Sequence, residues 1–374
     1  MLNYPDPIEP QLTVADFLHL QTMEIDGKAV TWAAGGTDTA AGQRQLRWQL
    51  PKVGLLSRIW IDVDGLTATG YDFTAGGGTG AVAADGMGPF GLVENIELRV
   101  NGSVALFNVS GFGAYLLEAA EAPEALPGVS SVGTIYTTAP TDIESTIFSY
   151  DPTQDHRPRW GISVPLSLAP GQPLGMVLAG NDQTSLELVL TLASLSKFAA
   201  LAGGGTAGLG LTFTPTLELF AVPEPVAFAQ FVRPLLDWAH VCRETQQDIV
   251  ATGDQRVTLD NHDNILQVLH TVKLNGALNV DSLTAGQFVL NMTDKRYEHG
   301  VATQLRRQRR AFQKDIPAWV WSFFTTGTLR DAIRADSYTD IRSILTVASG
   351  ATLGTAPFIR TAERRLVQLD ARAG

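Results

Sequence analysis

The stretch Leu98–Gly102 (LRVNG) returns as Val272–Gly276 (VKLNG), and this near-repeat is the first of three that follow one another in the same order. The other two pairs are Leu188–Ser194 (LVLTLAS) with Ser343–Ser349 (SILTVAS), and Leu217–Val222 (LELFAV) with Arg364–Leu369 (RRLVQL). The offset between the copies falls from 174 to 155 and then to 147 residues. Three ordered matches with shrinking offsets indicate a duplicated domain whose second copy has shorter loops.

Length and composition agree with two β-rich copies. The chain has 374 residues, whereas a single core usually serves ~100–200 residues. Apolar residues make up 45% and charged residues 17%, which indicates much buried surface, either inside a core or between subunits. The 36 glycines and 19 prolines supply the many turns that an all-β fold requires.

Alternating apolar and polar residues predict strands in both copies. These strands are expected at 45–50, 56–64, 96–100, 160–166, 186–192, 255–259, 266–274 and 319–323. Asn101-Gly102 closes one of them with a strong hairpin signal. One helix is expected in each copy, over Phe112–Ala122 and Ala302–Lys314. About eight short strands per copy predict an all-β fold of two tandem eight-stranded jelly rolls (a double jelly roll) with short helical insertions.

The chain is expected to divide into three segments. Residues 1–24 form an N-terminal arm, in which Thr13–Leu20 has the pattern of one short amphipathic helix. Residues 25–224 form the first jelly roll and residues 225–374 the second. Val226–Val241, which follows a proline pair, is expected to be a helix that links the copies.

Charge and cysteine content exclude several classes of protein. A net charge of −11 argues against a protein that coats nucleic acid, because neutralising phosphates requires a basic face. Cys242 is the only cysteine, so neither an intrachain disulfide nor a cysteine metal site can form. Met1–Asp6 lacks the basic and apolar regions of a signal peptide. The uncharged, glycine-rich stretch Phe198–Leu217 is expected to be a loop that runs into a strand, not a membrane span.

The histidines do not form a recognisable metal or catalytic motif. The chain has six, and neither an H-x-H nor an H-E-x-x-H pattern occurs among them. His270 lies in a predicted strand, where a core role is favoured over metal binding. Gly76–Gly80 is not a phosphate-binding loop, because no Gly-Lys-Ser/Thr follows it. We therefore expect no catalytic residue, no cofactor and no metal ligand.

Two groups of acidic residues allow a second interpretation. Asp260–Asn264 resembles the start of a calcium loop but lacks the required glycine and glutamate, so a turn between strands is favoured. Asp62 and Asp64 flank Val63 on one strand. They are suited to ion binding or acid–base chemistry, although an exposed strand end is the favoured interpretation.

The only dense basic run lies in the second predicted helix, and it consists of Arg306, Arg307, Arg309, Arg310 and Lys314. One interpretation is a solvated helix face. The other is a contact with an acidic surface, for which Glu118, Glu121 and Glu124 of the first copy are candidates. In a ring where the first copy meets the second copy of the next subunit, opposite signs would favour that register.

Three segments resemble parts of a known family. Leu50–Ile59, Val93–Gly102 and Phe324–Ile333 are similar to segments of the double jelly-roll major capsid proteins of tailless icosahedral phages with an internal membrane, the tectivirus type and its relatives. The resemblance extends from about Leu46 to Leu369. The family has no active site, so the resemblance implies a structural protein and not an enzyme.

The resemblance also implies a specific assembly. Such proteins form homotrimers of nearly hexagonal outline that tile an icosahedral shell, so this chain is expected in the virion capsid after synthesis in the host cytoplasm. Expected partners are further copies of the chain, other capsid or vertex proteins and minor membrane proteins. The arm over residues 1–24 is expected to lie near the internal membrane, and no direct contact with nucleic acid is expected. Three copies of a two-fold repeat present six similar units around one axis, which suits a lattice with six neighbours.

Two alternatives belong to other classes. A tandem β-sandwich protein that binds carbohydrate or a receptor, such as a phage spike or a cell-surface module, would show export signals or exposed aromatic clusters. A bicupin-like enzyme would require clustered histidines.

Overall fold

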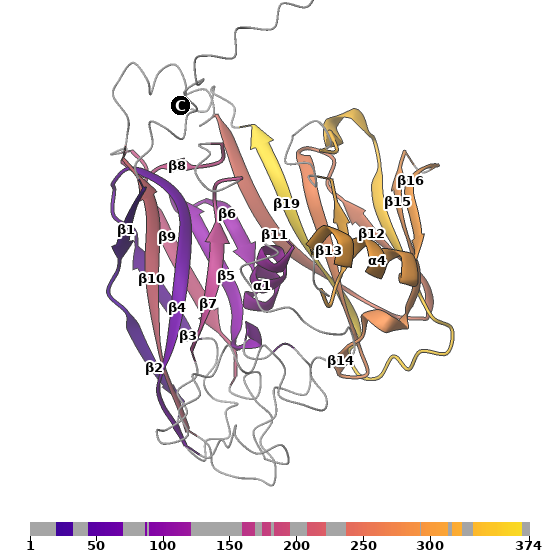
Figure 1. Ribbon diagram of the computed structural model, residues 1–374, viewed down its shortest axis with the longest axis horizontal. Helices are drawn as coiled ribbons and strands as arrows, with labels where there is room; N and C mark the ends of the chain where they lie inside the picture. The colour runs from indigo at the N-terminus through magenta and orange to yellow at the C-terminus, as the bar shows by residue number, and fades with distance from the viewer. Residues whose placement is uncertain are drawn as a thin grey trace, which may run out of the picture.

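The structure is a computed structural model of the full chain, shown in Figure 1. It describes residues 20–32, 44–69, 87, 90–120, 159–168, 174–180, 183–194, 208–221, 237–291, 293–312, 316–323 and 332–368. Within these ranges nearly all regular structure is β-strand, and the two α-helices are α1 (Gly111–Ala119) and α4 (Val301–Phe312).

The first half of the chain forms a sandwich of two antiparallel sheets. Sheet 1A has the order β1-β10-β4-β7, with β2 also paired to β10 and β8 to β4. Its strands are β1 (Leu20–Glu24), β2 (Lys28–Trp32), β4 (Leu55–Thr69), β7 (Arg159–Pro165), β8 (Val177–Leu178) and β10 (Gly208–Phe220). Sheet 1B has the order β3-β9-β5-β6. Its strands are β3 (Arg44–Gln49), β5 (Val93–Val100), β6 (Val104–Val109) and β9 (Leu186–Leu192).

The second half repeats this arrangement. Sheet 2A has the order β11-β19-β13-β17, and sheet 2B has the order β12-β18-β15-β16. The strands of sheet 2A are β11 (Trp238–Asp248), β13 (Asn264–Leu274), β17 (Trp319–Ser322) and β19 (Phe358–Gln368), with the short β14 (Ala277–Leu278) paired to β13. The strands of sheet 2B are β12 (Gly253–Leu259), β15 (Leu283–Leu290), β16 (Asp294–Gly300) and β18 (Ile341–Val347).

The two sandwiches share one topology, which is that of the jelly roll. The order of strands across sheet 1A corresponds to that across sheet 2A, and the order across 1B corresponds to that across 2B. Helix α1 connects β6 at the end of sheet 1B to β7 at the end of sheet 1A. Helix α4 connects β16 to β17 in the same way, so α1 and α4 are topological equivalents. The predicted fold class, an all-β double jelly roll, is confirmed.

The structure confirms one of the three repeats that the sequence suggested and corrects the other two. The pair 188–194 with 343–349 is right to the residue, because Leu188 lies opposite Leu98 as Ser343 lies opposite Phe288. The pair 217–222 with 364–369 matches the right strands, β10 and β19, but is out of register, because it pairs residues that lie on opposite faces of their sheets. Leu217 faces the core of its own roll, whereas Arg364 faces His240 at the junction between the rolls.

The match of Asn101-Gly102 with Asn275-Gly276 is wrong. Asn101 ends β5 in sheet 1B, whereas Asn275 ends β13 in sheet 2A. The equivalent of Asn101 is Asn291, which ends β15. Both turns that the sequence paired do have positive φ, 51° at Asn101 and 50° at Asn275. The shared dipeptide therefore reflects the same local backbone requirement at two different places in the fold.

Asn101 and Asn291 hold equivalent turns by equivalent bonds. Asn101 has φ 51° and Asn291 has φ 49°. The Asn101 Oδ1 atom accepts a hydrogen bond of 2.8 Å from the Ser185 N–H, and Asn291 Oδ1 accepts one of 3.0 Å from the Thr339 N–H. Each asparagine thus fastens the turn after its strand to the chain that leads into the neighbouring strand, β9 or β18.

Most predicted elements are confirmed, and two are corrected. The helices expected over 112–122 and 302–314 are α1 and α4. The linking helix over Val226–Val241 is wrong for its described end, since Trp238 begins β11, which pairs along its length with β19. Leu20–Glu24, assigned to the arm, forms β1 and pairs with β10, so the first roll includes these residues. Residues 1–19, 70–86 and 222–236 lie outside the described residues.

The two rolls are joined by a continuous sheet. Strand β6 of sheet 1B pairs in parallel with β11 of sheet 2A, through Phe107 opposite Cys242 and Asn108 opposite Arg243. Sheets 1B and 2A therefore form one nine-stranded sheet. Figure 1 shows the first roll on the left and the second roll on the right, with α1 between them. The outer faces of sheets 1A and 2B lie at opposite ends of the molecule.

Candidate functional site

The charged residues singled out in the sequence do not form one site. Arg306, Arg307, Arg309 and Arg310 are exposed on α4. Glu118 is only 4% exposed inside α1, so it cannot provide an acidic surface to a neighbouring subunit. It is buried because α1 is covered by the second roll. Glu121, Glu124 and Lys314 lie outside the described residues.

The other sequence candidates are structural. Asp260–Asn264 is the turn between β12 and β13, as expected, and Asp260 accepts a hydrogen bond from Arg243 at 3.2 Å. Asp62 and Asp64 are exposed, as expected, but they lie within β4 (Leu55–Thr69) and not at a strand end. In the part of the chain that the structure describes, no three His, Cys, Asp or Glu side chains cluster as metal ligands would. Gly76–Gly80 lies outside that part.

His270 and His240 are buried structural side chains. His270 lies on β13 with no exposed surface, and its Nδ1 atom is 2.9 Å from the Thr361 hydroxyl. Burial lowers the pKa of His270 to about 3. Burial, with help from the positive charge of Arg364, also lowers the pKa of His240 well below its usual value. Both imidazoles are therefore neutral in the folded protein near pH 7.

The junction between the rolls is built around α1. Ser110 caps this helix, because its hydroxyl accepts a hydrogen bond of 3.0 Å from the Gly113 N–H. Glu244, from β11 of the other roll, accepts a bond of 2.6 Å from the Ser110 N–H. At the opposite end of α1, Gln267 of β13 donates to the Ala120 carbonyl at 3.5 Å. The second roll thus holds both ends of the helix of the first.

Close packing at this junction requires a small residue in α1. A Cβ atom on Gly113 would lie 2.6 Å from Val109 and 3.0 Å from the Glu244 carboxylate. Burial raises the pKa of Glu244, while the positive charge of Arg360 and the bonds from Ser110 oppose that shift. Apolar residues of the second roll, including Cys242 and Leu269, belong to the same buried cluster as the first-roll core. The junction is therefore largely apolar, with the Glu244 carboxylate at the helix start and further buried polar side chains at Gln267, His240 and Arg364.

Two glutamines of helix α4 hydrogen-bond the edge of β17 that faces away from β13. Gln304 donates from Nε2 to the Val320 carbonyl at 2.5 Å, and Gln308 donates to the Ala318 carbonyl at 2.7 Å. The i, i+4 spacing along a helix, about 6 Å, is close to the i, i+2 spacing along a strand, about 6.6 Å. Both glutamines are buried, as is Phe312 at the end of the helix. Arg306, Arg309 and Arg310 are exposed on the rest of the helix surface.

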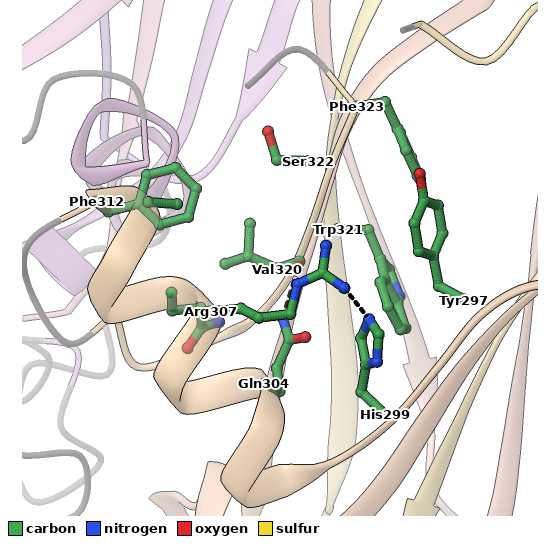
Figure 2. Close-up of a pocket in the computed structure, with 11 residues that line it drawn as sticks. Tyr297, His299, Gln304, Arg307, Phe312, Val320, Trp321, Ser322 and Phe323 are labelled. Carbon is green, nitrogen blue, oxygen red and sulfur yellow. Dashed lines mark hydrogen bonds between the residues drawn. The ribbon is translucent and has the colours of Figure 1, made fainter. Parts of the chain in front are cut away.

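A small groove lies between α4, β16 and β17, and Figure 2 shows its lining. Its cavity volume is about 60 Å³. The floor is aromatic, with the rings of Tyr297 and Trp321 stacked at 6.1 Å between centroids and Phe323 5.7 Å from Tyr297. Arg307 reaches over this floor, hydrogen-bonds His299 and lies 5.8 Å from the centre of the Tyr297 ring. Burial and the Arg307 charge lower the pKa of His299, which suits it to accept that bond.

Sequence reasoning missed the groups that hold these helices. Gln304 and Gln308 are spaced four apart within an arginine-rich segment, which is a signal for a polar contact on one face of the helix. Nothing in the local sequence marks Glu244, because its partner Ser110 lies 134 residues away.

Known proteins resemble this chain in fold but not in sequence. No protein-family model and no curated protein matches the sequence. Solved structures do match the fold. The major capsid protein of STIV, the Sulfolobus turreted icosahedral virus, is 14% identical, with a TM-score of 0.61 over 94% of this chain and 97% of that chain. A capsid structure of the virus PBCV-1 is 12% identical, with a TM-score of 0.55 over 96% of this chain and 95% of that chain.

A third structure extends the same fold to another virus. The Faustovirus major capsid protein is 9% identical, with a TM-score of 0.51 over 98% of this chain and 92% of that chain. The chain has the double jelly-roll fold. The match covers both rolls and the junction between them, which a single jelly roll would not produce. Among the described helices, none is long and apolar enough to span a membrane.

Proposed function

We propose that this protein is a viral major capsid protein whose homotrimers, nearly hexagonal in outline, tile an icosahedral shell. The observation that carries the proposal is the pair of topologically identical rolls joined through β6 and β11. The structural match to viral capsid chains over more than nine-tenths of the length supports it. A rigid tandem repeat in a head-to-tail ring of three copies presents six similar sides.

The finer parts of the proposal follow from the same role. The first roll ends near residue 224 and the second roll follows, and the segment before β1 lies near an internal membrane. The protein acts in the virion through contacts with its own copies, vertex proteins and minor membrane proteins, and it is not an enzyme. The acidic total charge of −11 agrees with a shell that does not contact nucleic acid directly.

The carbohydrate-binding alternative finds no support in the aromatic groove. Trp321 and Phe323 are each only 3% exposed, so their ring faces do not offer a stacking platform for a sugar.

Purified protein tests the proposal. Light scattering is expected to give three times the chain mass of 40.1 kDa, and negative-stain images are expected to show particles of nearly hexagonal outline. A monomer whose mass does not change with concentration, at conditions that permit assembly, would contradict the proposal.

A further inference from the structure

The two topologically equivalent helices are in very different surroundings. All nine residues of α1 are buried, because the helix packs between its own roll and sheet 2A. In α4 only Gln304, Gln308 and Phe312 are buried, and these face its own roll. Away from these residues α4 carries the exposed Arg306, Arg309 and Arg310, while the exposed Arg307 reaches over the groove beside Tyr297. Helix α4 therefore occupies the place of α1 without the covering sheet.

The strands beside the helices show the same difference. Strand β6 pairs with β5 on one side and with β11 of the next roll on the other. Its equivalent β16 pairs only with β15 among the described strands. At the opposite end of the molecule, β1 is the equivalent of the first part of β11 and pairs only with β10 among the described strands. All five residues of β1 are exposed. Such edges are suited to pairing with another chain.

The charges on the two end surfaces are complementary. Sheet 1A carries Glu24, Asp62, Asp64 and Glu218 toward its outer face, on the same side as Trp60 and Arg58. Helix α4 presents Arg306, Arg307, Arg309 and Arg310. The two halves of the chain differ in charge in the same sense. Residues 1–224 contain 23 acidic and 9 basic side chains, whereas residues 225–374 contain 15 acidic and 18 basic side chains.

We propose that the outer face of sheet 1A covers α4 of a second copy of this chain, in the way that sheet 2A covers α1 within one copy. In this contact β1 of one copy lies parallel to β16 of the next, which continues the sheet across the subunit boundary. The inference rests on the proposed trimer and names the surfaces that form it. Three such contacts alternate with three internal junctions, so the ring has six similar interfaces.

The internal junction also suggests the role of one acidic residue. Glu244 binds the start of α1 at Ser110, and the equivalent of Ser110 before α4 is Gly300, which has no side chain to cap the helix. The first turn of α4 contains no acidic residue. Core-facing residues of β10 and β19 align when the offset between the strands is one residue smaller or one residue larger than the sequence offset of 147. The smaller offset places Glu24 at the position of Glu244, and the larger offset places Asp26 there. A carboxylate at the end of β1 or just after it, from the second copy, would complete this helix start.

Charge reversal tests the contact. The variant Arg306→Glu/Arg310→Glu and the variant Asp62→Arg/Asp64→Arg are each expected to lose the trimer at moderate salt while keeping the far-ultraviolet circular dichroism of the folded chain. The four substitutions together are expected to restore the trimer. The matched control, Arg47→Glu/Arg256→Glu, makes the same change of charge at exposed positions of β3 and β12, the far edge strands of sheets 1B and 2B, and is expected to leave the trimer intact.

Crosslinking locates the contact independently. A short bismaleimide is expected to link Thr22→Cys/Glu298→Cys protein into dimers and trimers, because β1 and β16 would lie side by side. Each variant with only one of the two added cysteines is expected to run as a monomer on a denaturing gel. The same is expected of the pair Thr22→Cys/Arg256→Cys, because Arg256 lies on β12 at the far edge of sheet 2B. A wild-type trimer that survives Arg306→Glu/Arg310→Glu, or that crosslinks only through the β12 pair, would overturn this inference and leave the proposed function standing. A wild-type monomer would overturn the proposed function itself.

Discussion

The Glu244 carboxylate of the second roll accepts a hydrogen bond of 2.6 Å from the backbone N–H of Ser110 in the first roll. This bond joins the start of α1 to β11, at the place where β6 and β11 also pair. Arg360 lies 3.6 Å from the other oxygen of the carboxylate. The junction between the rolls is thus fixed by a directional bond as well as by apolar packing.

Replacement of Glu244 separates hydrogen bonding from charge. Glu244→Ala leaves the buried Ser110 N–H without its acceptor, which is expected to cost about 1–3 kcal/mol of unfolding free energy. Glu244→Gln keeps an acceptor oxygen at the same distance and removes a carboxylate whose pKa is raised by burial. We therefore expect Glu244→Gln to lie within about 1 kcal/mol of wild type. Denaturant unfolding of both variants measures this, and an equal loss in the two would contradict it.

The buried histidines predict acid sensitivity. The unfolded chain has histidine pKa values near about 6.5, whereas the pKa of His270 in the folded protein is about 3 and that of His240 is also lowered. The unfolded state therefore binds protons first. The stability from neutral burial is complete above about pH 6.5 and is lost as the pH falls toward 3, at up to about 1.4 kcal/mol per pH unit for each imidazole.

Unfolding free energies measured between pH 7 and pH 4 check this prediction. His270→Asn is expected to reduce the slope against pH by up to one proton. Replacement of the exposed His262 by asparagine is the control, since it keeps both buried imidazoles. A slope that His270→Asn leaves unchanged would show that this histidine is not the source of the acid sensitivity.

The two glutamines of α4 predict a local effect on stability. Gln304→Leu and Gln308→Leu each remove a donor, from the carbonyl of Val320 in β17 and of Ala318 just before it, at an expected cost of about 1–3 kcal/mol. Hydrogen exchange of α4 amides is expected to accelerate in both variants. Thr303→Leu, at an exposed position of the same helix, is the control. Unchanged exchange in all three variants would indicate that the glutamines do not hold α4 in place.

The equivalent turns at Asn101 and Asn291 predict matched substitution effects. In each, alanine would lose a hydrogen bond and adopt an unfavourable positive φ, for a combined cost of about 1.5–3 kcal/mol. Glycine adopts positive φ without this cost, so a glycine variant is expected to lose only the stabilisation from the hydrogen bond. Thermal unfolding of the four single variants measures the two series. A marked difference between the series would contradict the equivalence.

Local patterns in the sequence predicted most of the strands and both helices, because alternation and helical periodicity are local properties. The equivalence of the turns could not be predicted, since Asn-Gly satisfies a positive φ wherever a tight turn occurs, and Asn291 has no glycine after it. The start of β11 lacks the alternation of a strand because residues on both of its faces are buried or half-buried at the junction, which made it resemble a helix. Glu118 looked like a surface charge because nothing near it in sequence shows that the second roll covers α1.

The helices illustrate the same limit for the candidate site. The basic face of α4 is evident in the sequence, but Glu118, one of the three acidic residues suggested as its partner, is buried, and Glu121 and Glu124 lie outside the described residues. Asp62, Asp64 and Glu218 come together only because β4 and β10 are neighbours in sheet 1A. Exposed charge pairs of this kind contribute about 0.2–1 kcal/mol each. Their expected effect is therefore on the register and rate of assembly more than on the stability of the fold.

A cryo-electron microscopy map of the purified oligomer tests the central claim most directly. The account predicts a three-fold ring in which α4 of each copy lies under the outer face of sheet 1A of the next, with β1 beside β16. Contacts that join two first rolls or two second rolls, or a map in which the arginines of α4 face solvent around the whole ring, would contradict it.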